Sequence, residues 1–183
     1  TPDHLGDPSN EVRILNVPNL LTIARLFMVP VFGYLILAIE QTDAAQWASA
    51  TVFLVAALTD LVDGVWARRY GLVTNFGKIA DPIADKALIG TALVALSIQG
   101  DIAWWVTIVI ILREVAVTLL RFWVIKKGVI PASRGGKIKT LTQNFSVGFY
   151  ILPLPSFLFL PRDIFLGVAL LLTLLTGIDY LRK

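Results

Sequence analysis

The sequence predicts an all-α integral membrane protein with six transmembrane helices, and three observations lead to this fold class. Of the 183 residues, 56% are hydrophobic and only 16% are charged, and the mean hydropathy is +0.75. A water-soluble domain of this length cannot bury so much apolar surface in one core. The apolar runs recur along nearly the whole chain and are apolar on every face, whereas the strands of a membrane barrel alternate between apolar and polar residues.

Six apolar runs are long enough to cross about 30 Å of hydrocarbon, which takes roughly 20 helical residues. They occupy residues 20–39, 47–65, 79–97, 104–125, 141–160 and 164–180. Residues 1–18 are polar, so we expect a cytoplasmic N-terminal tail, whose last part could lie on the membrane surface as a short amphipathic helix. No internal repeat, low-complexity tract or long linker divides residues 19–183, which are expected to form one six-helix domain.

The basic residues between the runs predict which side of the membrane each loop faces. The loops after the second and fourth runs and the C-terminal end are basic, whereas Arg162 is the only basic residue in the opposite loops. Because positive loops stay on the cytoplasmic side, both termini are expected to be cytoplasmic. The net charge of +3 could also suit nucleic acid. However, topology and anionic headgroups account for these residues, so we expect no nucleic-acid partner.

Four aspartates gather at the cytoplasmic ends of the second and third runs. Asp60 and Asp63 are three residues apart and Asp81 and Asp85 are four apart, so each pair lies on one helix face and the pairs meet across a hairpin. A carboxylate near the centre of a membrane helix costs about 2.5–3.5 kcal/mol on insertion scales, so cations must compensate. One aspartate alone would be expected to face headgroup water or pair with a basic residue such as Lys86. Four with this spacing indicate an all-oxygen site for Mg²⁺ or Mn²⁺, which could hold two ions.

The same segment carries a longer pattern. It reads Asp60-x2-Asp63-Gly64-x2-Ala67-Arg68-x8-Gly77-x3-Asp81-x3-Asp85 and matches every position of the CDP-alcohol phosphotransferase signature. A gapped motif of this length rarely arises by chance. The chain resembles this family over essentially its whole length after the tail, and the resemblance implies the CDP-alcohol phosphotransferase fold.

The resemblance also implies a role for each residue of the pattern. Asp60, Asp63 and Asp81 would ligate two divalent metal ions, and Asp85 would be the general base and could also contact a metal. The implied site for the cytidine diphosphate group is lined by Gly64, Ala67, Arg68, Thr74 and Gly77. In this family an acceptor hydroxyl attacks a CDP-linked donor and CMP leaves. The chain has no cysteine and its only histidine is in the tail, so we expect direct displacement without a covalent intermediate, and no zinc site.

A polar stripe lies at the start of the first apolar run. Asn19, Thr22 and Arg25 recur every three residues and could contact the nucleotide or phosphates of the donor. The alternative is that Asn19 caps the helix and that Arg25 extends to the membrane surface.

Other segments bear on the acceptor. Residues 16–26, 112–121 and 133–143 resemble the phosphatidylglycerophosphate synthase branch of the family, in which the donor is CDP-diacylglycerol and the acceptor is sn-glycerol 3-phosphate. A phosphorylated acceptor requires cations, and the expected ones are Arg113, Arg121, Lys137 and Lys139. Two alternatives stay open: Glu114 could pair with one of the arginines, and the lysines could reflect membrane topology alone.

Competing hypotheses come from the same residues. A sibling enzyme could use inositol phosphate, serine or phosphatidylglycerol as acceptor. A cation transporter would place acidic residues near the middle of the bilayer, whereas here they cluster at one end. A purely structural scaffold would tolerate the substitution Asp85→Asn. The family resemblance further implies a homodimer. We also expect a bacterial cytoplasmic membrane, contact with membrane lipids and, from the basic loops, an active site that faces the cytoplasm.

Overall fold

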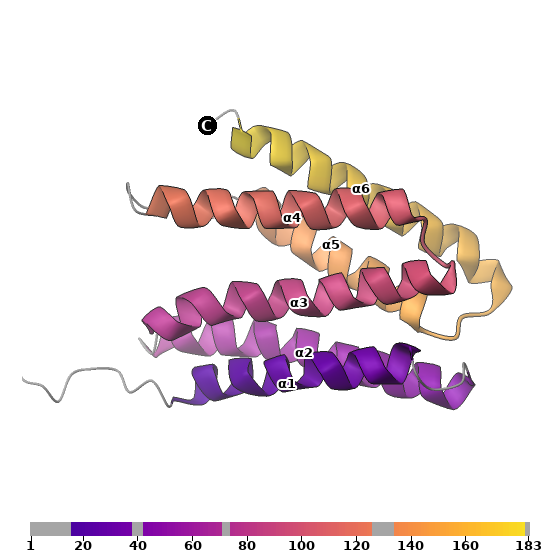
Figure 1. Cartoon of the computed structure of the whole chain (residues 1–183), viewed down its shortest axis with the longest axis horizontal. Coiled ribbons are helices and arrows are strands. Elements are labelled where there is room, and N and C mark those ends of the chain that lie inside the picture. The colour runs from indigo at the N-terminus through magenta and orange to yellow at the C-terminus, as the bar shows by residue number, and fades with distance from the viewer. Residues whose placement is uncertain (1–15, 38–41, 71–73, 126–133, 182–183) are drawn as a thin grey trace, which may run out of the picture.

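The computed structural model describes residues 16–37, 42–70, 74–125 and 134–181 (Figure 1). Within these ranges the backbone is described throughout, but several side chains are not, namely those of residues 61, 63–68, 75, 78, 121–125, 134–138 and 179–181.

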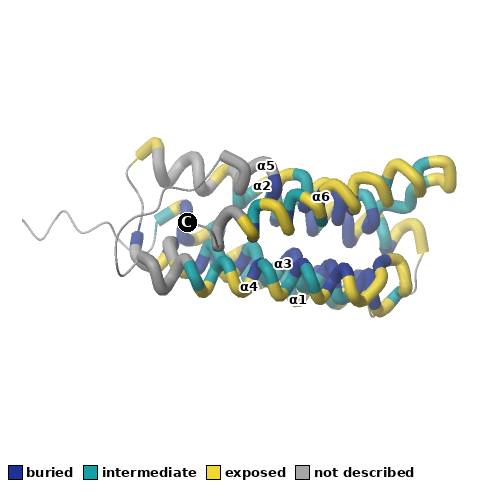
Figure 2. Tube along the Cα trace, turned by 90° about the horizontal axis from the view of Figure 1, so that it is seen from above, coloured by how far each residue is buried: buried dark blue, intermediate teal, exposed yellow. Residues whose placement is uncertain are grey.

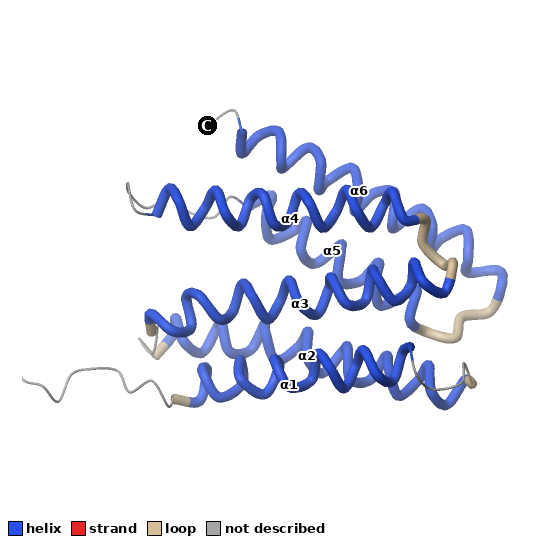
Figure 3. Tube along the Cα trace, in the orientation of Figure 1, coloured by secondary structure: helices blue, strands red, loops and turns tan. Residues whose placement is uncertain are grey.

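The described chain is built from six long helices and one short turn of 3₁₀ helix, and Figure 3 shows no strand in this part of the chain. The elements are α1 (Val17–Leu37), α2 (Asp43–Arg69), α3 (Asn75–Gln99), α4 (Trp104–Ile125), α5 (Arg134–Ile151), η2 (Ser156–Leu158) and α6 (Phe159–Leu181). They run back and forth, so the start of α1 and the end of α6 lie at the same end of the bundle. The expectation of an all-α architecture is confirmed.

The observed helix bounds agree with the expected apolar runs to different extents. The run 104–125 coincides with α4, and α3 is closed by Gly100, whose φ of 86° is the left-handed conformation that glycine adopts at helix ends. At its other end, α3 begins at Asn75, before its apolar run. Thr74 is the N-cap residue there, and its Oγ1 accepts a hydrogen bond from the backbone N–H of Gly77 at 3.0 Å.

The expected bounds of the fifth run, 141–160, were wrong. The helix α5 begins at Arg134 and ends at Ile151, and a short non-helical stretch with Pro153 and Pro155 separates it from α6. Proline has no N–H to donate, so a continuous apolar run did not make a continuous helix here.

The most extensive contacts between the helices are those of α1 with α2 and α3 and of α5 with α6, and the buried core is centred on α3, with members from all six helices. The rings of Phe32 and Phe53 lie 5.7 Å apart between α1 and α2. Fully buried alanines such as Ala56 and Ala92 allow neighbouring helices to approach closely, as is usual for helices in membranes. In Figure 2 the buried residues of facing helices lie toward one another, and exposed residues follow the outer surface.

The outer surface is strongly apolar. Side chains such as Phe27, Leu112 and Phe157 are more than half exposed, which would be unfavourable in water and suits a surface covered by lipid. In the described part of the chain, two stretches are apolar and long enough to cross a membrane, α1 and residues 156–178. Ionisable groups lie within the length of the helices, for example Arg25 in α1 and Arg113 and Glu114 in α4. The structure is therefore that of an all-α membrane protein with polar groups placed inside the bundle.

Candidate functional site

The polar stripe of α1 faces the inside of the bundle. Asn19, Thr22 and Arg25 are only 2%, 1% and 1% exposed, because residues three apart share one face and this face packs against α2 and α3. Arg25 therefore does not extend to the membrane surface. Asn19 does not cap the helix either, because the side chain of Asn16 accepts the hydrogen bond from the N–H of Asn19 at 3.0 Å.

The buried guanidinium of Arg25 holds Asp60. Its Nη1 donates to Oδ1 of Asp60 at 2.7 Å, and its Nε donates to the carbonyl oxygen of Ala56 at 3.1 Å. Both acceptors belong to α2 and lie one helical turn apart. The side chain of Asp60 itself is 29% exposed. One carboxylate oxygen is thus fixed from inside while the side chain as a whole reaches the surface of the bundle.

The hydroxyl of Thr22 holds Asp81 in the same manner. Its Oγ1 lies 2.5 Å from Oδ1 of Asp81 and 3.1 Å from the carbonyl oxygen of Pro18. A hydroxyl has one proton, and the nearer, charged carboxylate is the stronger acceptor. Because Thr22 and Arg25 are neighbours on one helix face, Asp60 and Asp81 are both tied to a single turn of α1.

Asn19 forms the third contact of this stripe. Its side-chain amide exchanges hydrogen bonds with the hydroxyl of Thr74, at 2.8 Å from Nδ2 and 3.0 Å to Oδ1. A Cβ on Gly77 would lie 3.0 Å from Oδ1 of Asn19 and 3.3 Å from Oγ1 of Thr74, so a side chain there would require these neighbours to move by a few tenths of an ångström. Gly77 thus allows α1 to pack closely against the start of α3.

A second charged group, which we call the Glu114 cluster, consists of Asp85, Lys86, Arg113, Glu114 and Lys139. Glu114 is 6% exposed. Its Oε1 accepts from Nη1 of Arg113 at 2.9 Å and from Nζ of Lys139, and its Oε2 lies 2.9 Å from Nζ of Lys86. Lys86 also contacts Oδ2 of Asp85 at 2.8 Å. Three cations face two carboxylates, so the cluster has a net positive charge.

Arg113 connects this cluster to α6. Its Nη2 donates to Oγ1 of Thr176 at 2.7 Å, and the absence of a side chain on Gly177 leaves room for the guanidinium. Its Nε is buried without a hydrogen-bond partner. Of the alternatives left open by the sequence, the pairing of an arginine with Glu114 is the one observed.

The structure brings together part of the predicted site. Asp60 of α2 and Asp81 of α3 both accept hydrogen bonds from the same turn of α1. Asp85 lies four residues after Asp81 on the same face of α3. The side chain of Asp63 is outside the described part, as are those of Gly64, Ala67, Arg68, Arg121 and Lys137. Among the described side chains no group of three acids or histidines is close enough to hold a metal ion, so the four-aspartate metal site stays a prediction. The donor chemistry suits it, because partly exposed carboxylate oxygens are ligands that Mg²⁺ prefers.

Sequence reasoning missed two connections. The bond between Arg25 and Asp60 joins residues 35 positions apart, and no local pattern indicates such a pairing. Lys86 was considered only as a counter-ion for an aspartate, whereas it links Asp85 to Glu114. The available signal was the presence of Glu114 itself, an acid that is rarely tolerated inside a membrane helix without a partner.

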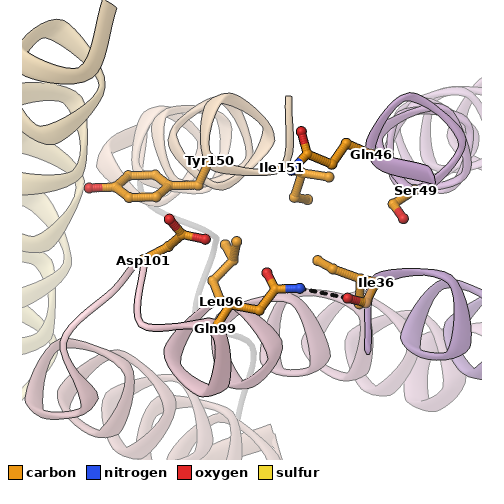
Figure 4. A pocket seen from close by; sticks show the side chains of 8 residues that line it. All are labelled: Ile36, Gln46, Ser49, Leu96, Gln99, Asp101, Tyr150 and Ile151. Carbon is orange, nitrogen blue, oxygen red and sulfur yellow. Dashed lines mark hydrogen bonds between the residues drawn. The ribbon is translucent and has the colours of Figure 1, made fainter. Parts of the chain in front are cut away.

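The opposite end of the bundle has a polar hollow of its own (Figure 4). It has about 250 Å³ of empty space, part of it open, and its lining consists of Ile36, Gln46, Ser49, Leu96, Gln99, Asp101, Tyr150 and Ile151. The amide of Gln99 crosses to the carbonyl oxygen of Ile36 at 2.6 Å. None of the residues predicted to do chemistry lies there.

Comparisons with known proteins agree on one family. Residues 15–176 match the CDP-alcohol phosphatidyltransferase family. A Mycobacterium tuberculosis protein called probable phosphatidylglycerophosphate synthase is 46% identical over 97% of this chain and 86% of its own length. Proteins called CDP-diacylglycerol–glycerol-3-phosphate 3-phosphatidyltransferase are 41% identical in Bacillus subtilis, over 93% of this chain and 95% of that one, and 39% identical in Rickettsia felis, over 91% and 94%.

Proposed function

This chain belongs to the CDP-alcohol phosphatidyltransferase family, and we propose that it transfers the phosphatidyl group of CDP-diacylglycerol to sn-glycerol 3-phosphate, giving phosphatidylglycerophosphate and CMP. The observation that carries the proposal is the similarity, over more than nine-tenths of the chain, to proteins named for this reaction. The Glu114 cluster adds support, because its excess of positive charge suits an acceptor that carries a phosphate.

The reaction replaces a phosphoanhydride bond of the donor with a phosphate ester to the acceptor. An acceptor hydroxyl attacks the lipid-bearing phosphorus of the donor, the bond from this phosphorus to the bridging oxygen breaks, and CMP departs with that oxygen. The protein must align the hydroxyl with the leaving group and offset the charge of the pyrophosphate.

We assign the acidic face of α2 and α3 to metal binding. Asp60, Asp63, Asp81 and Asp85 would hold two Mg²⁺ or Mn²⁺ ions, which when bound supply charge neutralisation at the pyrophosphate. On the protein side, Thr22 and Arg25 keep one oxygen each of Asp81 and Asp60 in place.

Asp85 is the proposed general base. The acceptor hydroxyl has a pKa far above 7 and must lose its proton as it attacks. A base placed to accept this proton typically raises the rate about 10²- to 10⁴-fold. Lys86 donates a hydrogen bond to Oδ2 of Asp85 at 2.8 Å, which orients the carboxylate.

The proposed donor site lies on the same face. Gly64 and Ala67 would admit the nucleotide, Arg68 would contact a phosphate, and Thr74 and Gly77 would border the cytidine. The tight packing of Gly77 against Asn19 supports a rigid wall at this position.

The proposed acceptor site is formed by Lys139 and Arg113, with Arg121 and Lys137 further along their helices. Lys139 and Arg113 both contact Glu114, from α5 and α4 respectively. Three cations against two carboxylates leave the Glu114 cluster with a net positive charge that attracts the phosphate of the acceptor, whereas serine carries no phosphate.

We place the protein in a bacterial cytoplasmic membrane, with six spans, both termini cytoplasmic and the charged end of the bundle facing the cytoplasm. The apolar outer surface supports the membrane part of this placement and the basic loops support the orientation. A homodimer is proposed from the family resemblance and is tested by cross-linking in membranes.

Purified protein with CDP-diacylglycerol and Mg²⁺ tests the activity. CMP release should require sn-glycerol 3-phosphate, and the lipid product should have the mass of phosphatidylglycerophosphate. CMP release with inositol phosphate in place of sn-glycerol 3-phosphate would show that the acceptor is wrong. Cation flux into liposomes without CMP release would show that the reaction class is wrong.

A further inference from the structure

We infer that Thr22 and Arg25 are positioning residues for the metal-binding carboxylates, and that the first turns of α1 act as a brace for the active site. This inference rests on the proposed function, since it assigns Asp60 and Asp81 to metal binding. It replaces the expectation that the polar stripe of α1 contacts the donor directly.

The polar groups of both side chains already have hydrogen-bond partners inside the protein. Thr22 and Arg25 are each 1% exposed, so neither presents a surface on which a nucleotide or phosphate could dock. The single proton of the Thr22 hydroxyl is directed at Asp81. The Arg25 guanidinium donates to two groups of α2, the carboxylate of Asp60 and the backbone carbonyl of Ala56.

The arrangement explains how two acids on different helices can be held in fixed orientations before a cation arrives. Like charges at short range repel, and side chains that are only partly buried can rotate apart. One oxygen of each carboxylate is fixed by a donor from α1. Because these donors are three residues apart on one rigid helix, they fix the two carboxylates relative to each other as well.

Hydrogen bonds that orient metal-binding carboxylates usually change metal affinity rather than abolish the chemistry, and removing one typically costs about 10- to 100-fold in affinity. Thr22→Val keeps the side-chain volume and removes the donor. We therefore expect it to weaken Mn²⁺ binding about 10-fold, while CMP release recovers most of its wild-type rate at saturating Mg²⁺.

Two further variants serve as controls. Thr22→Ser keeps the hydroxyl and should restore nearly wild-type Mn²⁺ affinity. Thr173→Val removes an equally buried hydroxyl that bonds only to the carbonyl of Ala169 in its own helix, and it should leave Mn²⁺ affinity unchanged.

Binding is measured on the purified full-length protein, without substrate, from the electron paramagnetic resonance signal of free Mn²⁺. Weaker binding in Thr22→Val alone supports the brace. Unchanged binding in Thr22→Val, equal loss in Thr173→Val, or no Mn²⁺ binding by the wild type would each overturn it.

The variant Arg25→Lys provides a second test of the brace. Lysine keeps the charge but cannot donate in the two fixed directions of a guanidinium, so we expect a loss of Mn²⁺ affinity of at least about 10-fold. Arg162→Lys at the opposite end of the bundle is the matched control. Equal affinities for Arg25→Lys and the wild type would count against the assignment of Arg25.

The two proposals fail in different ways. If the wild type binds Mn²⁺ but releases no CMP with any acceptor, the proposed function is wrong, and the Mn²⁺ measurements still decide on the brace. If the wild type is active and Thr22→Val binds Mn²⁺ normally at the same time, the proposed function stands and the brace is wrong.

Discussion

The two ends of the helix bundle both contain polar groups, but they use them differently. At the far end, around Gln99 and Tyr150, the partners are mainly neutral or backbone groups: Gln99 bonds to the carbonyl of Ile36, and Ser97 bonds to Thr107 at 2.7 Å. At the charged end, around Asp60 and Glu114, side chains of opposite charge pair with one another.

The difference shows what each end is built for. A neutral hydrogen bond satisfies both partners and leaves nothing to offer a ligand, so the far-end contacts fasten the helices. A partly exposed carboxylate has further lone pairs, and a cluster with more cations than acids attracts an anion. The ion pair at the far end also holds helices together. Arg162 of α6 pairs with its neighbour Asp163 and stacks on Tyr150 of α5, 4.0 Å from the ring centre.

The largest expected effect is that of Asp85→Asn. The amide cannot accept the proton of the attacking hydroxyl, so CMP release should fall by about 10²- to 10⁴-fold, while Mn²⁺ binding is partly retained. Asp163→Asn, which alters an acid at the far end, should leave turnover close to the wild-type rate. Equal turnover in the two variants would contradict the assignment of Asp85 as base.

Glu114→Gln should destabilise the protein. It leaves three cations around a neutral amide inside the bundle, and breaking a buried ion pair from one side costs about 3–5 kcal/mol. The melting temperature in detergent should therefore fall well below that of the wild type. The comparison is Asp163→Asn, whose acid is more than half exposed and which should melt near the wild-type temperature.

Lys139→Met should act mainly on the acceptor. Removing one of three cations weakens the attraction for a phosphate dianion, and we expect the KM for sn-glycerol 3-phosphate to rise about 10-fold, as for loss of a charge-assisted hydrogen bond. The KM for CDP-diacylglycerol should hardly change. Equal increases in both would indicate general damage to the charged end.

Gly77→Ala should give a smaller loss. The new Cβ would lie 3.0 Å from Oδ1 of Asn19, and such overpacking typically costs about 1–3 kcal/mol. Gly90→Ala on the same helix has no atom within 4 Å of the new Cβ. It should be neutral or slightly stabilising, because alanine favours helix. The melting temperatures of the two variants compare a closely packed position at the charged end with an open position on the same helix.

Much of this could be predicted from composition and spacing. The membrane class follows from the hydropathy, the helical architecture from the length of the apolar runs, and the shared face of Asp81 and Asp85 from their spacing, because these depend on residues close together in the chain. The end of α5 was misplaced because hydropathy does not register the effect of Pro153 and Pro155.

The tertiary structure alone decided which groups meet. Sequence indicated that Asn19, Thr22 and Arg25 share a helix face, but not that this face turns inward to hold Thr74, Asp81 and Asp60. It likewise indicated an acid in α4 without showing that cations from α3, α4 and α5 converge on it. The reason is physical: the period of a helix fixes which side chains point together, whereas their partners depend on how separate helices pack, and that packing depends on the whole bundle.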